Sequence, residues 1–533
     1  MLKRLKDKEL WLRLISMLLI AVMSYNGVMF SNAGDSYQQA TAFRIFCICF
    51  SALVLVNLPK KDTLTLASLL YLPLCYVFTH YAYEQHLIPD TCDYKFVEII
   101  RMGKLVILGW GLMFLALLKH LIREDLPRRF FAYIKEKGAL ACALPLLWCL
   151  YVIVLTLANP GYAYVIVFTV GFSAVFILCR DEAVRERLFK AYLDGVLICF
   201  FFLLQRALRR RPYDTERYLF YFSNENMAGM YLSTVLISLV LRLDRAWKCV
   251  KEKGGKLKLV LIHILLLCCG ILVAYNFTRT YLLGSGFALF VYFVIRMKKS
   301  KEKMKFALHF FLPLLLILLC MYPGYLVIRY TPALFDDPVF FYGEEGNPTR
   351  VQKGDPIDSP SYTSIQRYLT LSLGKMGIDL HIEDTEEQRE KAEEEGVVTL
   401  NPDRDVSNGR MWVWSLFLKE MSLKGHNPGH VIAEDRVIYH AHNTYFQNAF
   451  QYGIPAGVLF GLLIFASWLQ AVILNLKTKQ PKAAVTYALL AMSTMMVGML
   501  TEWSGHPVYP FGLLWLTAMT SLLYAECPKK DPA

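Results

Sequence analysis

Long apolar stretches separated by short polar ones recur along the whole chain. Each apolar stretch is close to twenty residues long, which is the length a helix needs to cross a hydrocarbon core of roughly 30 Å. The expected membrane spans, about fourteen in number, are residues 10–30, 41–58, 63–81, 97–118, 139–158, 162–179, 190–206, 226–242, 258–276, 281–297, 306–328, 455–475, 483–501 and 507–525. Barrel strands would alternate in short segments instead. The pattern therefore predicts an all-α, polytopic helical membrane protein.

The composition agrees with a membrane protein. Hydrophobic residues make up 56% of the 533 positions and charged residues 19%, whereas charged residues are about 25% of an average protein. The N-terminal segment MLKRLKDKEL precedes an apolar run that is too long for the core of a signal peptide. We therefore expect an uncleaved first span.

Lysine and arginine gather in every second loop, as the positive-inside rule requires of cytoplasmic loops. These basic loops are residues 3–8, 60–61, 123–137, 180–190, 242–258, 298–305 and 477–482. Both termini are then expected in the cytoplasm. The chain divides into an N-terminal bundle of about eleven spans (1–328), a large outer loop (329–454) and the C-terminal spans with a short tail (455–533). The net charge of +13 follows from the basic loops, so nucleic-acid binding is not expected.

One short loop departs from this charge pattern. It should lie outside, yet it carries the five arginines Arg206, Arg209, Arg210, Arg211 and Arg217. A miscounted span would move the loop to the cytoplasm, but it would also place the basic residues 298–305 outside. The alternative is that the loop forms an outward-facing site for an anion. Arginine rather than lysine dominates it, and a guanidinium can bind phosphate in a bidentate manner.

The outer loop ends in a segment that predicts an amphipathic helix near residues 408–421. The apolar positions that share one side of it are Met411, Trp414, Phe417, Leu418 and Met421. Arg410 opens this helix, where backbone N–H groups and the helix dipole favour an anion. The alternative interpretation of Arg410 is an interfacial arginine that snorkels to lipid headgroups.

Two histidines and an asparagine, His440, His442 and Asn443, stand directly before the span that starts near residue 455. Polar groups at that depth are costly unless they have partners or a function. An extended segment would put both imidazoles on one face. Three roles stay open: interfacial hydrogen bonding, acid–base chemistry by a neutral imidazole, and metal binding, which needs further ligands.

Two more polar positions stand at predicted outer ends of spans. Arg279 lies in NFTRT, between two spans that are too close for a solvated loop, so it either snorkels or binds a group held at the membrane. Asn226 belongs to NEN, which opens the span after the arginine-rich loop. Outward arginines and a neutral base suit a lipid-linked pyrophosphate whose isoprenoid tail lies among the helices.

Five short motifs resemble the O-antigen ligase and O-antigen polymerase superfamily. They are R-x-x-x-W at Arg410 to Trp414, the turn GHNPG, the segment HAHNTYFQNAFQYGIPAGVLFG, the span opening FSNENMAGMYL, and NFTRTYLLG. The motifs lie within residues 205–475, and their order and predicted sides of the membrane resemble those of the family. Two features depart from the family pattern, in which about twelve spans are common: the larger number of spans and the long outer loop.

The resemblance implies a multi-pass protein of the bacterial inner or cytoplasmic membrane with a type C glycosyltransferase-like fold. Its activity would be the transfer of a glycan from an undecaprenyl-pyrophosphate carrier to an acceptor hydroxyl or amide on the outer face, without a cofactor or a metal. The acceptor could be a glycan, a lipid, a protein or a cell-wall polymer. A ligase and a polymerase are both consistent with the motifs.

The resemblance also assigns roles to individual residues. His442 would be the base or the acceptor-orienting group, and Arg410 and Arg279 would hold the pyrophosphate. Supporting contributions to substrate binding are expected from His440, Asn443, Asn226, Arg206, Arg209, Arg210, Arg211 and Arg217. For His440 and the five arginines this role is a local inference, because they have no assigned counterpart in the family.

Three other functions are open on the sequence. Asp403 and Asp405 form a D-x-D that can hold a divalent cation with a phosphate, which would make the transferase metal-dependent. A lipid or polysaccharide exporter would show repeated halves and ionisable groups near the membrane midplane, and neither is evident. A non-catalytic subunit of an envelope assembly would leave the glycan product unchanged when the histidine and arginines are replaced.

Overall fold

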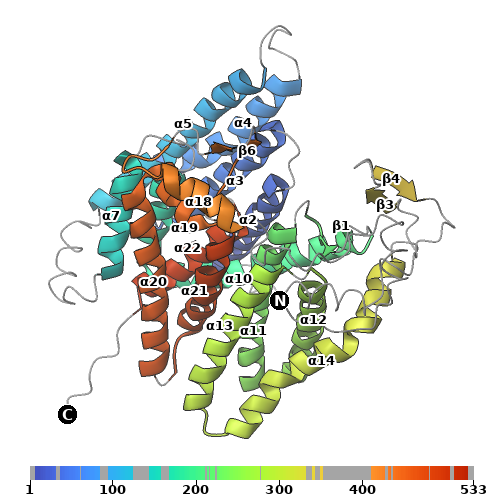
Figure 1. Cartoon of the computed structure of the whole chain (residues 1–533). Coiled ribbons are helices and arrows are strands. Elements are labelled where there is room, and N and C mark those ends of the chain that lie inside the picture. Colours follow the sequence, from blue (N-terminus) through green and yellow to red (C-terminus); the bar gives the residue numbers. More distant parts are fainter. Residues whose placement is uncertain are drawn as a thin grey trace, which may run out of the picture.

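Helices dominate the part of the chain that the computed structural model describes (Figure 1). The described residues are 7–31, 36–59, 62–84, 94–123, 143–157, 167–209, 213–214, 217–222, 225–276, 278–331, 339–342, 348–351, 410–426, 430–433, 436–478, 480–504 and 509–525. A helical segment lies at each of the predicted spans. The prediction of an all-α protein is therefore confirmed.

The helices before the predicted outer loop are α2 (Lys8–Ser31), α3 (Ser36–Asn57), α4 (Thr63–Glu84), α5 (Tyr94–Arg123), α7 (Ala143–Leu157), η1 (Val167–Phe172), α9 (Ser173–Leu178), α10 (Glu182–Ala207), α11 (Glu225–Lys248), α12 (Gly255–Asn276), α13 (Arg279–Lys299) and α14 (Lys303–Tyr330). The helices that follow are α18 (Arg410–Glu420), α19 (Thr444–Tyr452), α20 (Ile454–Lys477), α21 (Ala483–Thr501) and α22 (Pro510–Leu523). The strands form short antiparallel hairpins: β1 (Tyr213–Asp214) with β2 (Arg217–Tyr218), β3 (Val339–Tyr342) with β4 (Pro348–Val351), and β5 (Val431–Ala433) with β6 (Arg436–Ile438).

Several helices present long apolar side chains to the outside of the bundle. On α14, Leu308, Leu315, Leu318 and Leu319 are each more than half exposed. Soluble monomers rarely expose a contiguous apolar surface of this kind. Within the described residues, eight helices are long and apolar enough to cross a membrane, and further apolar helices are shorter. These features indicate a membrane protein, while the total of fourteen spans stays a prediction.

The helices before and after the predicted outer loop share one hydrophobic core. Helix α13 packs along α21 and α7 packs along α20, while α2 lies between α3 and α10 (Figure 1). Deep in this core, the hydroxyl groups of Tyr192 on α10 and Tyr487 on α21 share a hydrogen bond of 2.8 Å. Trp148 of α7 meets Trp515 of α22 with ring centroids 5.4 Å apart. The C-terminal helices are therefore integral to the bundle.

Helices α11, α13 and α21 run between two polar clusters at opposite ends of the bundle. At the first, called the His442 end, Oγ1 of Thr280 and Oγ1 of Thr501 lie 2.6 Å apart. At the second, called the Asp194 end, Asp194 of α10 pairs with Arg13 of α2 and Arg242 of α11. The 21 residues of α13 separate the two ends by about 30 Å, at 1.5 Å per residue, which matches the thickness of a hydrocarbon core.

Two glycines shape the turn that leads into α20. Gly425 and Gly453 have φ angles of 81° and 95°, a region that side chains with a Cβ rarely adopt. The N–H of Ile454 donates to the carbonyl oxygen of Ser422 at 3.0 Å and closes the turn. A Cβ at Gly453 would meet the carbonyl oxygen of Leu423, which belongs to the backbone and has little freedom to move. Glycine is thus required by conformation and by space.

We expect Gly453→Ala to lower the free energy of unfolding by about 1–3 kcal/mol, because it combines a positive φ with a backbone clash. Gly461→Ala on α20 is the matched control, since a Cβ there meets only the Tyr445 ring at 3.7 Å. The thermal midpoint of the detergent-purified protein is the measurement. Equal midpoints for the two variants would show that the turn tolerates a side chain.

Candidate functional site

Arg410 opens α18, and this helix is held against α19 by aromatic contacts. Trp414 meets Phe446 edge-on with ring centroids 5.6 Å apart, and Phe417 meets Phe450 at 4.7 Å. Phe417 is fully buried. Because these rings fix the helix, the guanidinium of Arg410 starts from a well-defined position at the His442 end.

The helix predicted near residues 408–421 is present as α18. Of the apolar side chains predicted to share one side, Phe417 is buried, whereas Met411 and Leu418 are exposed. Val413 and Leu416 pack on the small hydrophobic cluster around Phe417 instead. The reason is that α18 contacts both α19 and strand β5, so two directions of the helix are covered rather than a single stripe.

His442 has a strained backbone that its neighbours hold in place. Its φ is 46°, a left-handed value that is uncommon outside glycine. Before it, the N–H of Ala441 donates to Oε1 of Gln447 at 2.8 Å. After it, Asn443 caps α19 by accepting two backbone N–H groups and donates to the carbonyl oxygen of Leu500 at 2.8 Å. Strain that is enforced from both sides is typical of residues with a function.

The carboxylate of Glu502 joins Arg410 to His442. Glu502 directly follows α21, and its side chain is only 5% exposed. One carboxylate oxygen pairs with the guanidinium of Arg410, and the other lies 3.5 Å from Nδ1 of His442. The backbone is fixed as well, because Thr444 donates to the carbonyl oxygen of Glu502 at 2.7 Å and accepts from the N–H of Ser504 at 2.9 Å. The site therefore has a buried acceptor at its centre.

This arrangement can orient an imidazole for base chemistry. A carboxylate accepts a hydrogen bond, so the contact favours the proton of neutral His442 on Nδ1 and leaves a lone pair on Nε2. The side chain of His442 is 37% exposed, which leaves it accessible to a substrate. A base whose orientation is set by a third group is a recurrent feature of sites that activate a hydroxyl.

His440 lies beside His442, as the two-residue spacing predicts for an extended segment. The two rings meet edge-on with centroids 4.2 Å apart, and the ring of Trp503 lies 5.7 Å from that of His440. Burial, reinforced by repulsion from the neighbouring His442, lowers the pKa of His440 to about 4, although Glu502 acts in the opposite direction. His440 is therefore neutral near pH 7.

The backbone of Arg279 is close to this cluster. Arg279 is the first residue of α13. Its neighbour Thr280 contacts Thr501, the residue before Glu502. The structure thus places Arg279 at the His442 end, as the sequence predicts, within one residue of the contact that joins α13 to α21.

Asn226 stands in the first turn of α11, at the same end of the bundle. The carbonyl oxygen of the preceding residue, Glu225, accepts hydrogen bonds from Asn276 at 3.1 Å and from Thr278 at 2.9 Å. Those two donors flank the junction between α12 and α13. Asn226 therefore lies next to the junction that carries Arg279, while its contribution to substrate binding stays a prediction.

Arg206 lies at the C-terminal end of α10 and has aromatic partners. Its Nη1 donates to the hydroxyl groups of Tyr25 and Tyr221, each at 3.0 Å, and its guanidinium lies 5.0 Å from the centroid of the Phe202 ring. No carboxylate among the described residues neutralises it. No contact in the described part of the chain joins it to Arg410 or His442, so the structure does not bring Arg206 into the cluster.

The other predicted site residues are only partly within reach of the structure. Arg209 lies in the turn that ends α10, and its N–H donates to the carbonyl oxygen of Arg206 at 3.2 Å. Arg217 belongs to strand β2. The residues that fall outside the described part are Arg210, Arg211, Asp403 and Asp405.

Glu502 was not among the site residues predicted from the sequence. A signal was present nevertheless. Glu502 is an acidic residue at the end of an apolar span, where a charge needs a partner. It also lies on the same predicted side as Arg410 and His442, which supply that partner.

Comparisons of the chain with protein-family models, with curated proteins and with solved structures find no match. Within the described residues, no group of three histidine, cysteine or acidic side chains is arranged to hold a metal ion. The functional assignment therefore depends on the geometry at Glu502 and on the sequence motifs.

We expect Arg410 and Glu502 to be energetically coupled. Arg410→Gln or Glu502→Gln alone leaves one partly buried charge without its partner, so the double variant should cost at least about 1 kcal/mol less than the sum of the single changes. Thermal midpoints of the four proteins in detergent give the coupling. The exposed helical pair Glu302 and Lys305 is the control and should show a smaller coupling. Additive effects at Arg410 and Glu502 would contradict the pairing.

We expect His440 to make the folded protein less stable in acid. Its pKa is about 4 in the folded state and about 6.5 in an unfolded chain. Between these values the unfolded chain takes up a proton that the folded chain does not, so stability falls as the pH falls through this window. His440→Gln should reduce the drop in thermal midpoint from pH 7 to pH 5, with His430→Gln in the same loop as control. An unchanged drop in His440→Gln would contradict the assignment.

Proposed function

We propose that the chain is a membrane-embedded glycosyltransferase with a type C-like fold. It moves a glycan from an undecaprenyl-pyrophosphate carrier to an acceptor on the outer face of a bacterial cell membrane. The observation that carries the proposal is the shared carboxylate of Glu502, which contacts both Arg410 and His442. These two residues were independently expected in the site from the motifs they belong to.

The His442 end is suited to a pyrophosphate. The N-termini of α11, α13, α18 and α19 lie there, and helix N-termini favour anions. Apart from its pair with Glu502, the guanidinium of Arg410 makes no hydrogen bond within the described residues, so it retains donors for phosphate oxygens. Because Glu502 balances the charge of Arg410, we assign the net positive charge that holds the pyrophosphate to Arg279.

The proposed transfer is a single displacement at the anomeric carbon. Nε2 of His442 takes the proton of the acceptor hydroxyl as the hydroxyl oxygen forms a bond to that carbon. The bond between the anomeric carbon and the pyrophosphate oxygen breaks, and undecaprenyl pyrophosphate leaves with the bonding electrons. Arg410 and Arg279 stabilise the charge that develops on the leaving group. Glu502 stabilises the imidazolium that His442 becomes.

The partly buried arginine Arg206 has a place in this proposal. It stands at the C-terminal end of α10 with neutral tyrosine partners, so its charge is available to attract an anionic carrier. We propose that the loop from residue 206 to 217 assists capture of the donor. The acceptor is a glycan, a lipid, a protein or a cell-wall polymer, and its identity decides between a polymerase and a ligase.

The proposal predicts that His442→Ala and Glu502→Gln abolish most glycan transfer, with losses on the order of 10²–10⁴ in rate. The test is a deletion strain that expresses wild type or variant at matched membrane levels, with surface glycan and carrier-linked units measured. Loss of product together with accumulation of carrier-linked glycan supports a transferase. The product length in the wild type then separates a polymerase from a ligase.

His430→Ala and Glu420→Gln are the matched controls, since they remove the same groups outside the Glu502 cluster. Normal glycan in both His442→Ala and Glu502→Gln would contradict the proposal and favour export or an assembly role. A purified protein that joins glycan to acceptor without an ion gradient excludes the exporter. Thermal midpoints of the variants show whether a loss of product reflects unfolding.

A further inference from the structure

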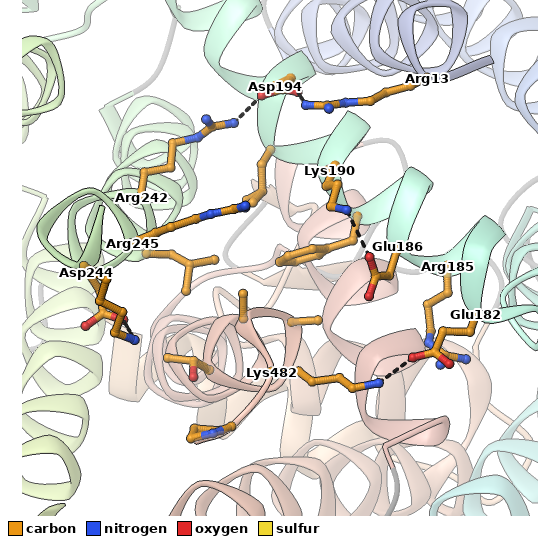
Figure 2. Close-up of a pocket in the computed structure, with 18 of the residues that line it drawn as sticks. Arg13, Glu182, Arg185, Glu186, Lys190, Asp194, Arg242, Asp244, Arg245 and Lys482 are labelled. Carbon is orange, nitrogen blue, oxygen red and sulfur yellow. Dashed lines mark hydrogen bonds and ion pairs between the residues drawn. The ribbon is translucent and has the colours of Figure 1, made fainter. Parts of the chain in front are cut away.

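A cavity of about 670 Å³ opens at the Asp194 end, between α2, α10, α11, α12, α13 and α21 (Figure 2). Nine basic and four acidic side chains line it, which leaves an excess of five positive charges. The length of the helices between the two ends separates this cavity from Glu502 by about 30 Å. The glycosyltransferase proposal makes no use of this cavity, and the inference drawn from it does not depend on that proposal.

The deeper carboxylates of the cavity are each saturated by two cations. Asp194 pairs with Arg13 and Arg242, as Figure 2 shows. Asp244 pairs with Arg296 at 2.6 Å and with Lys248 at 2.9 Å. Each cluster of two cations and one anion keeps a net positive charge. Asp194 and Asp244 therefore neutralise none of the remaining basic residues, and the other two carboxylates, Glu182 and Glu186, each pair with one lysine, Lys482 and Lys190.

Arg245 and Lys258 are basic residues of the cavity that form no ion pair within the described part of the chain. Arg242 has a further donor, because its buried Nε lacks a hydrogen-bond partner among the described residues. Figure 2 shows Arg242 and Arg245 extending from α11 toward the interior of the cavity. Like charges that converge in a concave site lower the stability of the protein unless an anion compensates them.

The cavity has the size and lining for an amphiphilic phosphate compound. Its volume lies within the range of about 300–1,000 Å³ that small-molecule sites occupy. Phe189, Leu193 and Leu241 add apolar surface beside the charges. Asp194 is twelve residues from the start of α10. Its carboxylate, at the bottom of the cavity, is therefore about 18 Å along this helix from its N-terminal end. Guanidinium groups bind phosphate oxygens in pairs, and basic pockets between spans bind anionic headgroups.

We propose that this cavity binds a phosphate-bearing anion that bridges α11 and α12 through Arg242, Arg245 and Lys258. The phosphate belongs either to the headgroup of an anionic lipid or to a soluble phosphate compound. Both share the same chemistry at the arginines. The positive-inside pattern predicts that the site faces the cytoplasm.

The test compares two double variants of the full-length protein in detergent. Arg245→Gln with Lys258→Gln removes two charges from the cavity, and Lys256→Gln with Lys303→Gln removes two exposed charges that do not line it. Each protein is titrated with short-chain phosphatidylglycerol, with short-chain phosphatidylcholine and with inorganic pyrophosphate. The thermal midpoint is followed as a function of ligand concentration.

We expect an anionic ligand to raise the midpoint of wild type and of the exposed-charge variant at similar concentrations. The cavity variant should need at least about tenfold more, since each basic residue near a membrane surface contributes about 1 kcal/mol. A response to phosphatidylglycerol alone identifies a lipid headgroup, and a response to pyrophosphate identifies a soluble phosphate. No response to either anion, or equal weakening in both double variants, would overturn the proposal.

Discussion

A buried carboxylate, that of Glu502, is the constraint on which the His442 end depends. A side chain that is 5% exposed cannot keep a negative charge unless cations and donors surround it. Arg410 and His442 supply them from a loop segment that is far from Glu502 in the sequence. The loop must therefore return to the end of α21, and the two ends of the segment between residues 410 and 442 are fixed by one group.

The neighbouring features follow from this constraint. His442 adopts a positive φ because Asn443 is held by Leu500 and by the start of α19, which leaves the ring to face Glu502. Helix α19 must then turn sharply into α20, and Gly453 makes that turn possible. The strained histidine and the glycine turn are thus two results of seating one short helix against the end of α21.

The sequence predicts the helices well and the site only in part, for a physical reason. Apolar runs indicate the positions of the spans directly, because each run by itself must be long enough to cross the hydrocarbon core of the membrane. The partners of Glu502 are 60 and 92 residues away, and no local pattern encodes such a contact. The apolar pattern of α18 also does not tell which side chains are covered, because its neighbours α19 and β5 decide this and leave Met411 and Leu418 exposed. Motifs located Arg410 and His442, yet only the fold shows that they share a carboxylate.

The packing between the two ends bears on how they influence each other. Ser285 of α13 donates to Ser233 of α11 at 2.9 Å, and Gly284 allows α13 to approach the backbone of α21 at Thr494. Close contacts of this kind make the three helices move as one body, because packed interiors deform little. A ligand at the Asp194 end can then raise the stability of the whole bundle by mass action. It alters chemistry at His442 only if the bundle has a second arrangement that the ligand binds differently, and a single rigid packing provides none. Within one rigid packing, a ligand at the Asp194 end therefore changes the stability of the bundle without changing the geometry around Glu502.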